Sequence, residues 1–322
     1  TLAMVCRRYI ENHDFSSVPY WKLSALMEKE GISLKAVGCK DYENEALAQT
    51  ALAALRSQSQ LTVETVTIKV THTAPPLLYD LTALQKDANR RHGFSADKTL
   101  SIAQSLYEKK ITTYPRTGSR YISEDVFEEV PVLLRKIGMP LSNPLNRHSV
   151  DNTKVTDHHA IIPTGETPSG LSTDEATVYQ MVSNRFVEAF SPDSEEERMQ
   201  VRFTDGTNTF TWKAYRQISL GWKAVQKGKK VEAEMKEYDD EQVLSSLPGL
   251  TEGEVLPLVS AEITEHKTKP KPLYTEATLL SAMENAGKEV ENAESKKAMA
   301  ECGIGTPATR ANIIETLILR DY

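Results

Sequence analysis

The sequence predicts a multidomain protein of mixed α and β structure, in which a mainly helical block is inserted into a β domain. Its 322 residues are enough for two or more domains of about 100–200 residues each. Alternating strand patterns occupy residues 21–70 and return from residue 199, whereas the region between them has helical periodicity. Pro75 and Pro76 break the first strand pattern and mark where the helical block begins.

The clearest predicted strand covers residues 61–70, where polar and apolar side chains alternate with a period of two. Such alternation is typical of an antiparallel strand with one face toward solvent. Residues 199–203, 209–215 and 254–258 have the same character, and Gly206 and Gly249 are predicted to lie in turns between them.

Capping signals predict where helices begin inside the block. Ser95 can cap a helix that runs through Tyr107, because a serine at this position accepts a hydrogen bond from the first helical turn. Residues 172–175, with the sequence STDE, form a capping box for a helix that ends near Phe190.

Both ends of the chain are also predicted to be helical. The first 15 residues read as the last part of a helix, and Thr275 can cap a helix over residues 276–286. A further helix begins with Pro307 near its first position. Because Thr1 is neither an initiator methionine nor the start of a secretory signal, we expect a fragment of a longer protein.

The composition excludes several classes of protein. Hydrophobic residues make up 39% and charged residues 26%, as in globular proteins, and no apolar run approaches the ~18 residues of a membrane span. The three cysteines, Cys6, Cys39 and Cys302, are scattered and form no C-x-x-C pair. We therefore expect a reducing cytoplasm and neither a disulfide framework nor a zinc ribbon.

The charge distribution is uneven. The formal net charge is −7 and the pI about 5.6, which for the whole chain disfavours nucleic acid. From Lys86 to Arg120, however, eight basic residues face three acidic ones. Because salt screens exposed charges beyond ~8–10 Å, this local excess matters more than the total. The strip can bind a phosphate backbone, or it can be the solvated face of a helix.

The most informative segment is residues 111–118, ITTYPRTG. A β-branched run ends on Tyr114, Pro115 stops strand pairing, and Arg116 follows. A phenol with a pKa of ~10 is a poor nucleophile, but a nearby guanidinium lowers that pKa and can also grip a phosphate. The pattern favours attack of a tyrosine on a phosphodiester. On these eight residues alone, an aromatic at a strand end beside a surface arginine is the other interpretation.

A second candidate is the segment 156–164, TDHHAIIPT. His158 and His159 follow Asp157, yet the spaced partners of a zinc site are missing, so we expect no metal site in this chain. A histidine that hydrogen-bonds a phosphate or assists proton transfer is the functional interpretation. Two polar loop histidines are the alternative.

The third candidate is the segment 303–310, GIGTPATR. Its glycines, together with Thr306, Thr309 and Arg310, stand at a helix N-terminus, which is a favourable position for an anion. The segment is not a Walker A motif, so ATP is not implied. An ordinary connection between helices would have a similar sequence.

Together and in this order, the three segments resemble the type IA DNA topoisomerases, and the bacterial topoisomerase III branch most closely. ITTYPRT at 111–117 matches the active-site tyrosine motif of that family, and DHHAIIPT at 157–164 matches its histidine motif. YTEATL at 274–279 and GIGTPATR match its C-terminal helical part. The resemblance extends over essentially the whole chain.

The resemblance implies an isomerase that breaks one DNA strand, keeps its 5′ phosphate on the tyrosine, passes another strand and reseals without ATP. Tyr114 would be the nucleophile, Arg116 would stabilise the tyrosinate and the transition-state charge, and His158 would contact the phosphate. Thr309 would bind DNA backbone, with Thr306 and Arg310 as further DNA contacts.

The resemblance also implies what lies elsewhere. The family carries a Toprim domain with a catalytic glutamate and a Mg²⁺ site, and neither is found in this sequence. We therefore expect the fragment to be inactive alone. The implied division is a helical part at 1–17 and 263–322, a β arch at 18–76 and 197–262, and an inserted domain at 77–196 that carries the tyrosine.

The implied partners are single-stranded DNA and negatively supercoiled or catenated DNA, for a monomer in the cytoplasm associated with the nucleoid. A non-catalytic single-strand-binding module that kept the fold is the alternative. A tyrosine recombinase is disfavoured, because its arginines and histidines precede a C-terminal tyrosine, whereas here Tyr114 comes first.

Overall fold

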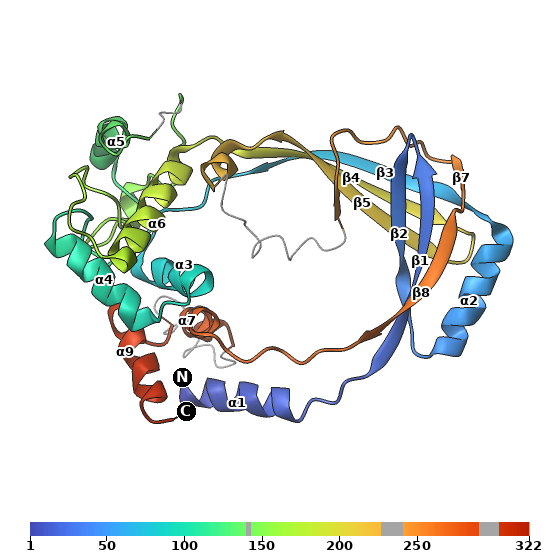
Figure 1. Cartoon of the computed structure of the whole chain (residues 1–322), viewed down its shortest axis with the longest axis horizontal. Coiled ribbons are helices and arrows are strands. Elements are labelled where there is room, and N and C mark those ends of the chain that lie inside the picture. The colour runs from blue at the N-terminus through green and yellow to red at the C-terminus, as the bar shows by residue number, and fades with distance from the viewer. Residues whose placement is uncertain (140–142, 227–240, 290–302, 322) are drawn as a thin grey trace.

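The computed structural model describes residues 1–139, 143–226, 241–289 and 303–321, and its elements are arranged in a ring (Figure 1). The sheet lies at the right of the view and a group of helices at the left. Strands β3, β4 and β5 extend toward the helices along the top, and α1 and the segment after β8 run along the bottom. The predicted mixed α and β class is confirmed.

In the described residues the strands form one 8-stranded sheet in the order β7-β3-β4-β5-β2-β1-β8, with β6 added on β5. All pairs are antiparallel except β5 with β6. The sheet joins both predicted strand regions, since β1 pairs with β8 and β3 with β4. The strands are β1 Pro19–Lys29, β2 Ile32–Tyr42, β3 Gln60–Thr73, β4 Ser194–Thr204, β5 Thr209–Ser219, β6 Glu241–Val243, β7 Val255–Pro257 and β8 Ser260–Lys267.

One face of the sheet is covered by α2, Glu45–Gln58, which packs against β1 and β8. The strand pattern predicted across this region is wrong for these residues. Ala48, Leu52 and Leu55 are buried at a spacing of four and three, which is helical, and the Asn44 side chain accepts a hydrogen bond from the Leu47 N–H at 3.0 Å. The helix therefore covers apolar side chains of the sheet that would otherwise be exposed to solvent.

The inserted block contains four α-helices among the described residues: α3 Leu81–His92, α4 Ala96–Glu108, α5 Glu124–Lys136 and α6 Thr173–Phe190. The predicted caps are confirmed: Ser95 Oγ accepts from the Lys98 N–H at 3.0 Å, and Ser172 and Glu175 exchange bonds of 2.8 and 3.2 Å. Helix α6 is central to the block, because its buried residues face two apolar clusters, one shared with α3 and α4 and the other with α5.

The helices at the two ends of the chain lie beside this block. Helix α1, Leu2–His13, α7, Glu276–Glu284, and α9, Pro307–Ile318, are as predicted, with Pro307 the first helical residue of α9. Leu81 and Leu100 of the block share an apolar cluster with Leu280 of α7. Ion pairs and backbone bonds add to it, including Lys86 Nζ to Glu284 Oε2 at 2.6 Å.

Two further observations concern membrane-spanning helices and cysteines. No helix in the described part of the chain has the length and apolar character to cross a membrane. Cys6 and Cys39 are free and exposed, and Cys302 lies outside the described residues.

Candidate active site

Tyr114 lies on a loop that is held by hydrogen bonds before and after the tyrosine. The strand predicted before it is wrong: Thr112 makes an isolated β-bridge with Pro163, and no strand continues. Pro163 and Pro115 have no N–H, so the ladder cannot extend. The Thr113 side chain replaces part of the ladder, because its hydroxyl donates to the Ala160 carbonyl at 3.1 Å and accepts from the Ile162 N–H at 3.0 Å.

The structure brings Tyr114 and His158 together. Their ring centroids are 4.5 Å apart, although the residues are far apart in sequence. Buried Thr117, from the tyrosine motif, donates its hydroxyl to the His158 carbonyl at 3.0 Å and so ties the two loops. Tyr114 is partly exposed and His158 is exposed, so solvent reaches both.

Arg116 is exposed and makes no hydrogen bond or ion pair with any described residue. Most of the predicted basic strip is neutralised within the fold. Its five paired cations are Lys86 with Glu284, Arg90 and Arg91 with Asp87, Lys98 with Asp174, and Lys109 with Glu175. Arg120 donates to the carbonyls of Leu77 and Leu78. Within the described segments, Arg116 and Lys110 are the strip's cations left for a ligand.

The first turn of α9 lies beside the tyrosine loop. A Cβ on Gly118 would stand 3.5 Å from Pro307 Cγ, which places the third candidate segment next to the first. Thr306 and Thr309 are exposed, and the Thr306 N–H donates to Thr309 Oγ1 at 2.9 Å. Gly303 is required here, since its φ is +63° and a Cβ would stand 2.3 Å from the Met283 carbonyl oxygen.

Arg310 does not have the exposed position that a DNA contact requires. Its residue is 4% exposed, and its guanidinium donates to Thr82 Oγ1 at 3.1 Å and to the carbonyls of Ile304 and Gly305. It also lies 3.5 Å from Glu284. The sequence pattern suggested an anion contact because a helix N-terminus with an arginine is favourable for one, but here the side chain turns inward and joins α9 to α3 and α7.

Sequence reasoning did not identify two residues of this site. Asp80, at the start of α3, is buried beneath the tyrosine loop, where the next residue's N–H donates to the Thr117 carbonyl at 3.1 Å. Burial raises the pKa of Asp80. Tyr107 packs edge-on against Tyr114, with ring centroids 5.3 Å apart. The one signal in the sequence for Asp80 was its position just before a helix, where an aspartate can act as a cap.

No group of three or more His, Cys, Asp or Glu side chains in the described residues could hold a metal ion. His159 Nδ1 lies 2.8 Å from the Ala160 carbonyl, a local contact.

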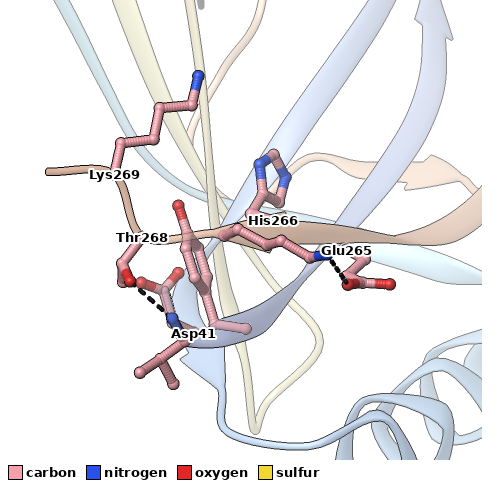
Figure 2. Close-up of a pocket in the computed structure, with 8 residues that line it drawn as sticks. Asp41, Glu265, His266, Thr268 and Lys269 are labelled. Carbon is pink, nitrogen blue, oxygen red and sulfur yellow. Dashed lines mark hydrogen bonds and ion pairs between the residues drawn. The ribbon is translucent and has the colours of Figure 1, made fainter. Parts of the chain in front are cut away.

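A separate depression of about 930 Å³ lies where β1 begins and β8 ends (Figure 2). It is lined by Tyr20, Asp41, His266 and Lys269 among others, and the two segments are joined there by the Val18 N–H donating to Thr268 Oγ1 at 2.9 Å. None of the predicted site residues lines it.

Comparison with known proteins identifies the family of this chain. A family model described as DNA topoisomerase matches residues 1–322. DNA topoisomerase 3 of Shouchella clausii is 34% identical, with 100% of this chain and 46% of that protein covered, and DNA topoisomerase 3 of Bacillus subtilis is 37% identical, with 98% and 46% covered. The structure of full-length topoisomerase I from Thermotoga maritima matches with a TM-score of 0.74 and 26% identity, over 100% of this chain and 50% of that one.

The chain therefore belongs to the DNA topoisomerase family, in its type IA branch. It spans about half the length of the curated relatives it matches.

Proposed function

We propose that this chain is the strand-cleaving and gating part of an ATP-independent type IA topoisomerase, in which Tyr114 is the nucleophile. The phenol oxygen attacks a backbone phosphorus, the bond from phosphorus to the 3′ oxygen breaks, and a 5′-phosphotyrosine forms. The leaving 3′ oxygen takes up a proton and later attacks the same phosphorus to reseal the strand. Because the phosphotyrosine keeps the energy of the broken bond, no ATP is needed.

The observation that carries this proposal is the contact of Tyr114 with His158, with Arg116 two residues further along the chain. The Tyr114 and His158 ring centroids are 4.5 Å apart, both residues are open to solvent, and Arg116, two residues after Tyr114, is unpaired among the described residues. An unpaired arginine beside a nucleophile suits the charge of a phosphate in the transition state. His158 is suited to donate a hydrogen bond to a phosphate oxygen.

We propose a different set of DNA-contacting residues from the one that the sequence suggested. Exposed Thr306 and Thr309 flank the tyrosine loop and are suited to bind backbone phosphates. We assign Arg310 a structural role instead, because its buried guanidinium is already bonded within the protein. Lys110, exposed near Tyr107, is a further candidate for a phosphate contact.

We further propose the division into residues 1–17 with 263–322, 18–76 with 197–262, and 77–196. The apolar clusters support it: the buried residues of one lie in the sheet and α2, apart from Leu250 before β7, and the buried residues of two others lie between residues 78 and 190. Magnesium, which the family uses, would be held outside this chain, and would supply charge stabilisation at the reacting phosphate. Monomeric state and a nucleoid-associated location belong to the same proposal.

The test is formation of a covalent adduct. In the full-length protein, labelled single-stranded DNA should become protein-linked under denaturing conditions, and Tyr114→Phe should abolish the link. Persistence of the link in Tyr114→Phe would show that another residue is the nucleophile. This chain alone with Mg²⁺ should not relax negatively supercoiled DNA, and relaxation would contradict our assignment of it as an incomplete site.

The second candidate function is a non-catalytic single-strand-binding module. Exposed rings and unpaired cations beside Tyr114 favour it, since bases stack on aromatic side chains and phosphates bind cations. It predicts DNA binding without any covalent link in the full-length protein, so the same adduct assay separates the two.

A further inference from the structure

The orientation of the Tyr114 side chain depends on two neighbouring rings. Its hydroxyl has no hydrogen bond to a described residue, and its ring contacts in the described chain are with His158 and Tyr107. Tyr107 lies edge-on, at an interplanar angle of 77° and a centroid distance of 5.3 Å. Edge-to-face pairs at this distance are favourable and directional.

The end of α4 that carries Tyr107 is fixed to α6. Glu175 Oε1 accepts from Lys109 Nζ and from Ser105 Oγ, each at 2.6 Å, and Leu106 is fully buried. The bond from Lys109 and the bond from Ser105 lower the pKa of Glu175 to about 2, so this carboxylate is charged at neutral pH. The position of Tyr107 is therefore set by the body of the domain.

A tight turn brings Tyr107 back onto Tyr114. Lys110 adopts a φ of +62°, its N–H donates to the Tyr107 carbonyl at 2.8 Å, and the Ile111 N–H donates to the Leu106 carbonyl at 2.9 Å. The Thr113 N–H then donates to the Ile162 carbonyl at 3.0 Å. The backbone before Tyr114 is thus held, while its side-chain torsions are restrained by ring packing.

We propose that Tyr107 is a positioning residue for the reaction: its ring holds the Tyr114 phenol in the orientation that attacks the phosphorus. The inference rests on the function proposed above. Tyr107 is 40% exposed, so its ring adds little to the core, and its loss is separable from unfolding. Its aromatic ring, rather than its hydroxyl, makes the contact, so phenylalanine should replace it and leucine should not.

The first experiment uses this chain alone and is independent of catalysis. With ring-labelled tyrosine, NMR should show a nuclear Overhauser contact between the Tyr107 and Tyr114 rings. Tyr107→Leu should shift the Tyr114 ring resonances, whereas Tyr107→Phe should leave them close to their original positions. Absence of the contact, or unchanged Tyr114 resonances in Tyr107→Leu, would overturn the inference.

The second experiment measures single-turnover cleavage of single-stranded DNA by the full-length protein. Tyr107→Leu should lower the rate at saturating DNA by about 3- to 10-fold, the range expected for one aromatic pair, without changing the DNA dissociation constant. Tyr107→Phe should restore the rate. Tyr179→Leu, which removes a partly buried ring of α6 in the same domain, is the matched control and should leave the rate unchanged.

Two outcomes would overturn the positioning role. An unchanged cleavage rate in Tyr107→Leu would show that Tyr107 does not position Tyr114. A loss confined to DNA affinity would show that Tyr107 stacks on a base instead. Failure of the proposed function has a different signature: Tyr114→Phe would still form the covalent link, while the ring contact seen by NMR would persist.

Discussion

Replacing Thr117 with valine tests how the tyrosine loop and the histidine loop are joined. Thr117 is 3% exposed, and its hydroxyl makes two bonds: it donates to the His158 carbonyl at 3.0 Å and accepts from the Ser119 N–H at 3.0 Å. Valine has the same shape but no hydroxyl. The substitution therefore removes both bonds without opening a cavity.

The magnitude follows from the burial of the two partners. The Ser119 N–H is buried and would lose its acceptor, which costs about 1–3 kcal/mol. The His158 carbonyl belongs to an exposed residue, so water can replace its donor at a smaller cost. We expect a total of about 2 kcal/mol, equivalent to about 30-fold faster local opening.

Amide hydrogen exchange of this chain measures that opening directly. The Ser119 amide should exchange about 30-fold faster in Thr117→Val, and Thr117→Ser, which keeps the hydroxyl, should restore most of the protection. In the full-length protein, Thr117→Val should also slow formation of the covalent DNA link, because the His158 loop is no longer tied to Tyr114. Equal exchange rates in Thr117→Val and the unaltered chain would refute the reasoning.

Three further predictions concern the surroundings of the site. Arg310→Met should lower the free energy of unfolding in urea by about 3 kcal/mol, because it leaves buried partners unpaired. Thr309→Ala should weaken DNA binding at unchanged stability. If instead Arg310→Met weakened DNA binding and Thr309→Ala lowered stability, Arg310 would be the DNA contact. The pKa of Glu175 is lowered to about 2 from 4.5, so its contribution to stability is complete above pH 4.5 and is lost as pH falls toward 2. Glu175→Gln should flatten this part of the acid-unfolding curve, and an unchanged curve would contradict the shift. A double-mutant cycle of Lys86→Met with Glu284→Gln should give a coupling of about 1 kcal/mol across the α3–α7 contact, and additivity would show that the 2.6 Å pair adds nothing.

Local signals in the sequence predicted the local structure well. Ser95 and the 172–175 capping box begin helices where expected, because a cap depends on residues within one turn. The strand at 61–70 is confirmed, but its alternation predicts burial only at Leu61 and Val63, because the register shifts after Val63 and the apolar Ile68 and Val70 are exposed. The helix α2 also had a local signal, in Asn44 and the buried residues at 48, 52 and 55, which the neighbouring strand patterns obscured.

The parts of the site that depend on tertiary contacts could not be predicted in this way. Nothing in the sequence around Arg310 indicates that its side chain turns toward Thr82, which is distant in sequence. The contact of Tyr107 with Tyr114 depends on a left-handed backbone at Lys110, a conformation that lysine seldom adopts. The family motifs identified Tyr114, Arg116 and His158 as candidates, and their catalytic roles stay predictions.

Peptide mapping of the covalent DNA adduct tests the central proposal most directly. The full-length protein would be trapped on single-stranded DNA, digested, and the modified peptide identified by mass spectrometry. We predict a nucleotide joined through its 5′ phosphate to Tyr114, and a free 3′ hydroxyl on the released strand. A nucleotide on any other residue, or a 3′ phosphate linkage, would contradict the assignment of Tyr114 as the nucleophile.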